Sequence, residues 1–324
     1  MKKDNHGYHT FFTFPGVRTG IYQSLDVLAQ LTSALFWKHN FGPIHLYCDQ
    51  RHLDGLKKYG VDKVYDSIDT SLMKRMPAVD ERYWSFAKIF LAKELSETVK
   101  RFTILDTDLW LKSIPPTWDA SADLQALHEE DFDYNFQFNP YPDPQVFLHE
   151  DCTGLDWRTK PLNCGVIHLN NPELVQNWYQ LAKAVIDSNL GKEPMGYSCE
   201  IVFIEQRILA TVAAGMGLKV ATLIPSLFTT QIEAYAADAP NPWVPPLTST
   251  DLLVSCEKSI RHIWGLKRTY HDVNVRQMVI NTLYKDVDEV LGSEALDGYE
   301  QLLSDVKTLN QPTITLNMVP SSNG

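Results

Sequence analysis

The chain has 324 residues, and its 29 lysines and arginines against 40 aspartates and glutamates give a formal net charge of −11. This balance argues against nucleic acid as a partner, because a protein that binds a phosphate backbone needs a basic surface. The five cysteines are scattered without a Cys-X-X-Cys pair, which is typical of reduced thiols. No run approaches the ~20 apolar residues of a membrane span, and Asp4, Asn5 and His6 stand where a secretory signal would need apolar residues. We therefore expect a cytoplasmic protein with no transmembrane segment.

Short apolar runs alternate with amphipathic stretches in the N-terminal part of the chain. They predict strands at 11–14, 44–48 and 61–65, and helices near 25–36, 53–59 and 85–95. Such alternation is typical of right-handed crossovers between parallel strands. We therefore predict an α/β fold whose sheet is mixed but mostly parallel and is flanked by helices.

The alternation continues through the rest of the chain. Strands are predicted at 102–105, 124–127, 161–169 and 259–265, and helices from 172 onward and at 200–214, 278–290 and 296–306. A long loop is predicted at 133–156, because this stretch is rich in aromatic residues, Pro, Asn and Asp. Loops of this length in a compact protein are commonly functional, so we expect an acceptor-binding or lid segment, with disorder as the alternative.

A pair of aspartates follows the buried strand predicted at 102–105. The apolar run ends directly at Asp106 and Asp108. Open α/β sheets bind ligands at the carboxyl ends of their strands, and carboxylates are costly to bury without a partner. The pair therefore indicates a site for a hard cation, and a cation there suggests a phosphate ligand. The alternative is that one aspartate caps the next turn and the other is solvated.

The order of motifs resembles that of the A-type (GT-A) glycosyltransferase superfamily. The likeness is to the glycogenin/galactosyltransferase-like family and to bacterial polysaccharide sugar transferases. It extends over about residues 8–270 and rests on the Asp-X-Asp pair, an Asn-X-Gly run at 163–165 and a late segment at 262–268. It implies that Asp106 and Asp108 hold Mn²⁺ or Mg²⁺, which grips the diphosphate of a nucleotide sugar.

The resemblance, together with the amphipathic pattern beyond His271, predicts a division of the chain. A Rossmann-like GT-A catalytic domain would occupy residues 1–270, followed by a C-terminal helical extension at 271–310 and a flexible tail at 311–324.

The late segment resembles the His-X-X-Gly-X-X-Lys signature of the glycogenin-like family, whose histidine completes the metal shell and whose lysine reaches the donor diphosphate. His262 and Gly265 fit this signature, but Lys267 stands one position early and Arg268 stands at the family's spacing. Either residue would neutralise phosphate, and an arginine would do so through two parallel hydrogen bonds. An imidazole with carboxylates suits Mn²⁺ better than Mg²⁺. The alternative is a histidine at a strand end followed by a solvated basic pair.

Four further residues take site roles from this resemblance. Lys88, on the helix before the metal strand, would reach donor phosphate or sugar, or else extend from a buried face to solvent. The Asn163 amide would bond sugar hydroxyls, and Gly165 would let the backbone approach the ligand or mark a bulge. Glu205 would face the acceptor and act as general base in an inverting enzyme, with an ion pair to Arg207 or a neighbour as the alternative.

Three residues near the N-terminus take roles from their position. Thr13 follows the first predicted strand, where folds of this superfamily hold the base and ribose. Tyr22 would stack on uracil, and Asp49, at the end of the second strand, would bond the base or ribose. A purely structural role is the alternative for each of the three.

Together these features predict a metal-dependent glycosyltransferase that moves a sugar from a nucleotide-diphosphate sugar to a hydroxyl of a saccharide, lipid-linked or protein acceptor. UDP is the expected nucleotide, and the resemblance to the glycogenin-like family favours retention at the anomeric carbon. A haloacid-dehalogenase-like phosphohydrolase is one alternative, but that family places Asp-X-Asp-X-Thr/Val near its first strand, whereas Trp110 stands at the last position here. A nucleotidyltransferase would need a Gly-X-Gly-Thr-Arg-Leu signature, which residues 16–20 do not reproduce. A non-catalytic sugar-nucleotide-binding protein is the third alternative.

Overall fold

The computed structural model describes residues 5–12, 23–130, 154–192, 199–224, 259–263 and 272–309. The strands in these ranges are β1 (Gly7–Phe11), β2 (Ile44–Cys48), β3 (Ser67–Asp69), β4 (Phe102–Leu105), β5 (Leu109–Leu111), β6 (Leu124–Ala126), β7 (Val166–Leu169), β8 (Val220–Thr222) and β9 (Ile260–His262). The α-helices are α1 (Gln23–Asn40), α2 (Gln50–Lys58), α3 (Leu72–Arg75), α4 (Phe86–Ser96), α5 (Pro172–Ser188), α6 (Cys199–Val202), α7 (Ile208–Gly215), α9 (Val273–Leu291) and α10 (Glu300–Thr308). Short 3₁₀ turns are η1 (Val61–Val64), η2 (Glu81–Tyr83) and η9 (Ser293–Leu296), and η6 (Phe203–Arg207) is a π-helical segment.

Within the described residues, seven strands form one sheet in the order β3-β2-β1-β4-β7-β6-β8. Neighbours along β3-β2-β1-β4 are parallel, as are β6 and β8, whereas β7 is antiparallel to both β4 and β6. Within this seven-stranded sheet β7 alone runs against the other strands, so the predicted mixed, mostly parallel sheet is confirmed. Phe11 pairs with Cys48 and His9 with Leu105, which brings the carboxyl ends of β1, β2 and β4 to one edge.

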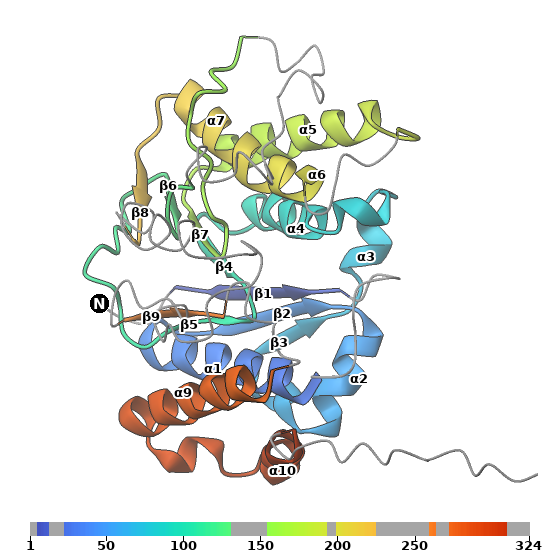
Figure 1. Ribbon diagram of the computed structural model, residues 1–324. Helices are drawn as coiled ribbons and strands as arrows, with labels where there is room; N and C mark the ends of the chain where they lie inside the picture. Colours follow the sequence, from blue (N-terminus) through green and yellow to red (C-terminus); the bar gives the residue numbers. More distant parts are fainter. Residues whose placement is uncertain are drawn as a thin grey trace, which may run out of the picture.

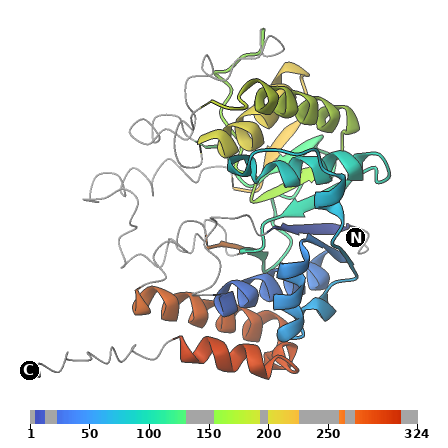
Figure 2. The same ribbon diagram turned by 90° about the vertical axis from the view of Figure 1, so that its right-hand side faces the viewer.

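Helices cover both faces of this sheet (Figure 1). α1 and α2 lie under β1, β2 and β3, with α9 and α10 outside α1, while α4, α5, α6 and α7 lie over the opposite face. The view turned by 90° shows the same layers (Figure 2). Two buried apolar clusters correspond to these faces: one includes side chains of α1, α9 and α10, and the other includes side chains of α4, α5 and α7.

α1 is the helix that joins the N-terminal strands to the C-terminal helices. Buried residues occur on all its sides, as expected for a helix enclosed in a core. Its Leu25, Leu28 and Leu31 belong to the same cluster as Val279 of α9 and Leu302 of α10. The predicted division of the chain at residue 270 stays a prediction.

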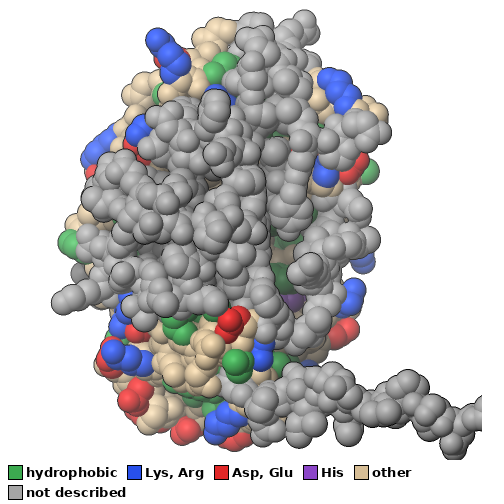
Figure 3. Space-filling model, viewed as in Figure 1, with side chains coloured by type: hydrophobic (Ala, Val, Ile, Leu, Met, Phe, Trp, Pro, Cys, Tyr) green, Lys and Arg blue, Asp and Glu red, His purple; other side chains and the backbone are tan. Residues whose placement is uncertain are grey.

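The outer surface of the C-terminal helices carries charges of both signs. In Figure 3, acidic and basic side chains lie close together on the lower part of the molecule, over α9 and α10. None of the described helices combines the length and apolarity that spanning a membrane requires.

Several predicted elements are found where the sequence indicates them, namely α1, β2, α2, α4, β4, β6 and α5, and the C-terminal helices α9 and α10. The start of α5 shows why: the Asn171 side chain accepts a hydrogen bond from the Leu174 N–H at 3.0 Å, and Pro172 occupies the first turn. The predicted loop at 133–156 lies outside the described residues up to 153, and the tail at 311–324 lies outside them entirely.

Two strand predictions in the N-terminal part are wrong. The predicted strand at 61–65 is the 3₁₀ turn η1, in which Val61 and Val64 are both buried at the three-residue spacing that such a turn repeats. The first strand is β1, which shares only Phe11 with the strand predicted at 11–14; Phe12 is described outside a strand, and residues 13–14 lie outside the described residues. A search for apolar runs does not find β1, because β1 contains the polar residue His9. His9 is nevertheless fully buried, and its ring nitrogens form hydrogen bonds with the hydroxyls of Tyr65 at 2.8 Å and Ser33 at 3.0 Å.

Buried histidines should make the folded state sensitive to acid. Burial lowers the pKa of His9 to about 3 and that of His168 to about 4, from the value of 6.5 that applies in the unfolded chain. Below pH 6.5 the unfolded state therefore binds more protons. The free energy of unfolding should fall as the pH drops from about 6.5 toward 4, by up to roughly 1.4 kcal/mol per pH unit and per histidine.

Urea unfolding of the wild type and of His168→Asn, between about pH 7.5 and 5, tests this expectation. The variant should lose less stability with acid than the wild type, because it lacks one of the buried groups. Identical slopes for the two proteins would contradict the proposed origin of the pH dependence.

Candidate metal centre at the junction of two sheets

Asp106 and Asp108 lie in a tight turn that connects the large sheet to β5. β4 is buried along its whole length between β1 and β7, and Asp106 follows its last residue. The Asp106 N–H donates to the carbonyl oxygen of Gly165 at 2.8 Å, and the Leu109 N–H donates to the Asp106 carbonyl at 3.3 Å. The turn thus leaves the two aspartates at the carboxyl edge of the sheet, as the sequence predicts.

His262 reaches the same place from a distant part of the chain. β9 pairs with β5 in an antiparallel ladder, in which His262 stands opposite Leu109. One residue further, the Ile263 N–H donates to the carbonyl oxygen of Asp108 at 3.0 Å. The Nε2 atom of His262 consequently lies 3.7 Å from Oδ1 of Asp108.

Asp106, Asp108 and His262 together form a candidate metal centre. One ligand atom from each lies within 4.8 Å of the other two, and no other group of three such ligands was found among the described residues. The side chain of Asp106 is 34% exposed, against 15% for Asp108 and 8% for His262, so the cluster opens to solvent mainly beside Asp106. Two carboxylates and an imidazole are a donor set that fits Mn²⁺.

The ammonium group of Lys88 lies beneath Asp106. Its Nζ atom donates to Oδ1 of Asp106 at 2.7 Å, to Oε1 of Glu205 at 2.5 Å and to the carbonyl oxygen of Cys164 at 3.0 Å. An ammonium group has three donors, so each of them has an acceptor here. The side chain is 7% exposed, and the alternative that Lys88 extends to solvent is therefore wrong.

The charges of the buried pair Lys88 and Glu205 depend on each other. Burial by itself would lower the pKa of Lys88, but the carboxylates of Asp106 and Glu205 raise it above its usual value. Burial raises the pKa of Glu205, an effect that Lys88 opposes and Asp106 reinforces. Lys88 therefore stays protonated and compensates the negative charge of the acids around it. The ion pair of Glu205 is thus with Lys88, whereas the sequence alone suggested Arg207 or a neighbour as its partner.

Glu205 lies in the π-helical segment η6, between α6 and α7. The predicted helix at 200–214 is therefore present but interrupted. Single π turns inside helices occur frequently at functional sites. Here the segment carries Glu205 to the buried face that meets Lys88.

Asn163 and Gly165 lie just before β7 and not inside a strand, so the strand predicted at 161–169 is too long. Oδ1 of Asn163 accepts from the Gly165 N–H at 2.9 Å, and its Nδ2 atom donates to Oε1 of Glu130 at 2.9 Å. A side chain that bonds the backbone two residues later favours a turn over a strand ladder. A Cβ atom on Gly165 would lie 3.1 Å from Cε1 of His262, so glycine is what allows the imidazole to approach.

Two residues that were not predicted as site residues lie around this loop. Glu130 and His128 follow β6, and both are buried. Burial raises the pKa of Glu130 to about 7, although the hydrogen bond from Asn163 lowers it, and burial lowers the pKa of His128 to about 3. The signal that could have found them is the same as for Asp106: ionisable side chains directly after a buried strand.

Of the remaining predicted site residues, the structure describes only Asp49. Asp49 follows β2 and caps α2, where its Oδ1 atom accepts from the His52 N–H at 2.8 Å. Its predicted contact with the base or ribose stays a prediction. Four predicted residues lie outside the described part of the chain, namely Thr13, Tyr22, Lys267 and Arg268.

No protein-family model matches the chain, and neither does any curated protein. Solved structures do resemble it. The galactosyltransferase LgtC in complex with donor and acceptor sugar analogues is 12% identical over 61% of this chain and 69% of that protein, with a TM-score of 0.36. The apo form of mouse xyloside xylosyltransferase 1 is 13% identical over 67% and 84% of the two chains, with a TM-score of 0.38.

A nucleoside-diphosphate-sugar pyrophosphorylase from Vibrio cholerae RC9 also matches, with 10% identity over 66% of this chain and 90% of that one and a TM-score of 0.36. All three superpositions are partial.

Removing the Lys88 charge should destabilise the protein strongly. In Lys88→Met the buried Glu205 loses its partner, so the free energy of unfolding should fall by about 3 kcal/mol or more. The matched control is Lys93→Met on the same helix, which breaks an ion pair with Glu97 whose side chains are 26% and 52% exposed. That change should cost less than about 0.5 kcal/mol. Urea unfolding of both variants measures the difference, and equal losses would contradict the role given to Lys88.

Proposed function

We propose that this chain is a metal-dependent glycosyltransferase with a GT-A fold, which moves a sugar from a nucleotide-diphosphate sugar to an acceptor hydroxyl. The observation that supports this most directly is the convergence of Asp106, Asp108 and His262 at the carboxyl edge of a mostly parallel sheet. Open α/β sheets bind ligands at that edge. A cation held there by two carboxylates retains positions for the oxygens of a diphosphate.

In this proposal Asp106, Asp108 and His262 hold the cation, which is Mn²⁺ in preference to Mg²⁺ because one ligand is an imidazole. When bound, the cation supplies positive charge that stabilises the nucleoside diphosphate as its bond to the sugar breaks. Lys267 or Arg268 adds a second positive charge on the diphosphate. We take UDP as the nucleotide and retention at the anomeric carbon as the outcome, on the resemblance to the glycogenin-like family.

Lys88 and Glu205 act through Asp106. The ammonium group of Lys88 holds one oxygen of the Asp106 carboxylate, and Glu205 holds the ammonium group from the other side. Because Glu205 is buried and paired, we assign it to positioning Lys88. Its predicted role as general base would belong to an inverting reaction. A contact between Lys88 and donor phosphate would require Lys88 to release one of its three acceptors.

Asn163 and Gly165 shape the loop against which His262 lies. The Asn163 amide is bonded on both sides, to the Gly165 N–H and to Glu130. We propose that this pair keeps the backbone close to the metal ligands, and that Asn163 or Glu130 also contacts hydroxyls of the bound sugar. The acceptor is a saccharide, a lipid-linked sugar or a protein.

Thermal shift with a panel of nucleotides, with and without Mn²⁺, tests the metal-dependent donor site. Ligands that bind only the folded state raise the melting temperature. UDP with Mn²⁺ should raise that of the wild type, and Asp108→Asn should abolish the Mn²⁺-dependent part without changing the melting temperature of the free protein. Asp54→Asn, an exposed carboxylate on α2, is the control and should behave as the wild type.

The outcomes separate the remaining alternatives. Mn²⁺-dependent UDP binding together with release of UDP from a UDP-sugar supports the transferase. The same binding without turnover on any nucleotide sugar and acceptor supports a sugar-nucleotide-binding protein. No shift with any nucleoside diphosphate would contradict the proposed donor site.

A methyl group at Gly165 should weaken metal binding by moving His262 or Asn163. The Cβ atom of Gly165→Ala would lie 3.1 Å from both Cε1 of His262 and Oδ1 of Asn163, so a neighbour must shift. We expect the Kd for Mn²⁺ to rise roughly tenfold, as for other substitutions of residues that hold a metal ligand in place. Gly215→Ala is the control, because its Cβ atom would meet Leu155 at an ordinary 3.6 Å. Titration calorimetry with Mn²⁺ measures both, and equal affinities would contradict the close approach.

A further inference from the structure

A buried carboxylate on the C-terminal helix α9 bonds to both strands of the small sheet. Asp286 is 1% exposed. Its Oδ2 atom accepts from Nε1 of Trp110 at 3.0 Å and from Nε of Arg261 at 3.1 Å, and its Oδ1 atom accepts from Nζ of Lys112 at 2.5 Å. Trp110 lies on β5, Lys112 directly follows it, and Arg261 lies on β9.

These contacts join the two strands at matching positions. Trp110 and Arg261 are directly opposite each other in the β5–β9 ladder, so a single carboxylate oxygen bonds to both members of one pair. The Lys112 N–H donates to the carbonyl oxygen of Ser259 at 2.7 Å, which places the Lys112 contact at the far end of the same ladder. Asp286 therefore spans the pair of strands from outside.

The candidate metal ligands stand one step further along this ladder. The pair next to Trp110 and Arg261 is Leu109 and His262. Asp108 immediately precedes Leu109, and its carbonyl oxygen accepts from the Ile263 N–H. Any shift of β9 along or away from β5 would therefore change the position of His262 relative to Asp108.

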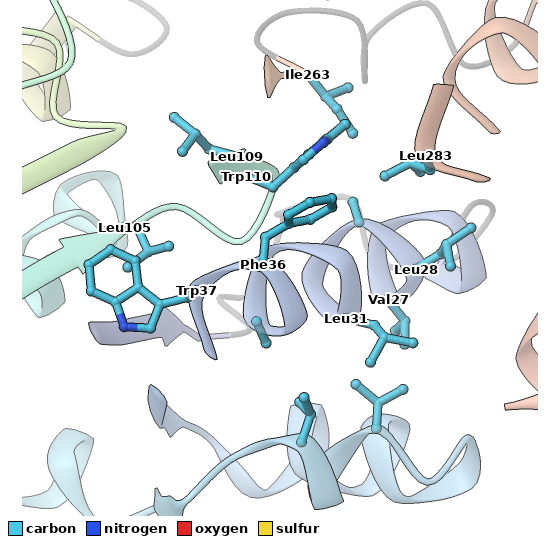
Figure 4. Close-up of a cluster of buried hydrophobic side chains, with 14 of the residues drawn as sticks. Val27, Leu28, Leu31, Phe36, Trp37, Leu105, Leu109, Trp110, Ile263 and Leu283 are labelled. Carbon is cyan, nitrogen blue, oxygen red and sulfur yellow. The ribbon is translucent and has the colours of Figure 1, made fainter. Parts of the chain in front are cut away.

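The β5–β9 pair needs support from outside, because an isolated two-stranded sheet is marginally stable. Apolar packing supplies part of it: Figure 4 shows Leu109, Trp110 and Ile263 above α1, with Phe36 pointing toward them and Leu283 coming from α9. Such packing is not directional. Hydrogen bonds to a fixed carboxylate are directional, and Asp286 supplies them to both strands.

The charges at Asp286 are compensated by Lys112 and Arg261. A buried ion pair of this kind is weak support for stability, since an apolar group of similar volume is often as stable or more so. The burial of Asp286 is therefore better explained by a role in fixing the positions of β5 and β9 than by a gain in stability.

We propose that Asp286 is a positioning residue: it fixes β9 against β5 and thereby sets His262 relative to Asp108. The part of this inference that concerns metal affinity rests on the proposed function, whereas the part that concerns the strands does not. It gives the C-terminal helix α9 a role in the site without contact to the ligand.

The experiment compares Asp286→Asn with Glu289→Gln. Asparagine keeps the shape of Asp286 and removes its charge. Glu289 lies on the same helix and also contacts Lys112, at 3.3 Å, but its side chain is 48% exposed. The Kd for Mn²⁺ is obtained from the free Mn²⁺ signal in electron paramagnetic resonance. In Asp286→Asn this Kd should rise about 10- to 100-fold. The Kd of Glu289→Gln should stay within about twofold of the wild type.

Hydrogen exchange on the same proteins reports on the strands without metal. The amides of Ile263 and Lys112 should exchange faster in Asp286→Asn than in the wild type, while amides of β1 and β2 keep their rates. If Asp286→Asn does not fold, Arg261→Gln breaks the contact from the strand side, where the side chain is 20% exposed. Faster exchange at the same two amides is expected there too.

The outcomes distinguish this inference from the proposed function. Unchanged exchange at Ile263 and Lys112 in the folded variant overturns the inference. An unchanged Kd for Mn²⁺, with a loss of global stability alone, also overturns it, because that is the result of a merely structural carboxylate. If the wild type binds no Mn²⁺, the proposed function fails, and the exchange rates alone decide the role of Asp286 in the strands.

Discussion

The buried ammonium group of Lys88 is the interaction on which the candidate site depends. Its acceptors are Asp106, Glu205 and the carbonyl oxygen of Cys164, so α4, the end of β4, the turn before β7 and the π segment η6 meet at one charge. Carboxylates this close in a region of low dielectric repel each other and favour a shared proton. The positive charge of Lys88 removes that conflict. Asp106 therefore has a fixed cation beside it at the edge of the sheet.

The second constraint is the junction between the two sheets. Asp106 is fixed by the large sheet, through β4 and the Gly165 carbonyl, whereas Asp108 and His262 are fixed by the β5–β9 pair. Their convergence requires both sheets to keep their relative position on α1. Apolar packing of α1 and α9 against the small sheet, with Asp286 bonded across it, supplies this fixed position.

Sequence reasoning located the aspartate pair because an apolar run ending in acids is a local pattern, and it located His262 through a short motif. It was wrong for the strand at 61–65, and it made the strand at 161–169 too long, because β7 begins only at Val166. In the first, two buried valines follow a 3₁₀ repeat. In the second, Asn163 bonds the backbone N–H of Gly165, and this turn delays the start of β7 until Val166. It also gave no role to Glu130, because Glu130 stands in a run of three acids, Glu129 to Asp131, and the local pattern does not tell which of them is buried.

The sequence by itself determined the α/β class, the mostly parallel sheet and the place of Asp106 and Asp108, since all of these follow from the local alternation of apolar and polar residues. The tertiary structure decided which charges meet. The partner of Glu205 turned out to be Lys88, and the C-terminal helix supplied Asp286 to the strands that carry the metal ligands. Such pairings join segments far apart in the chain. They are set by the packing of helices on sheets, which no local pattern of residues encodes.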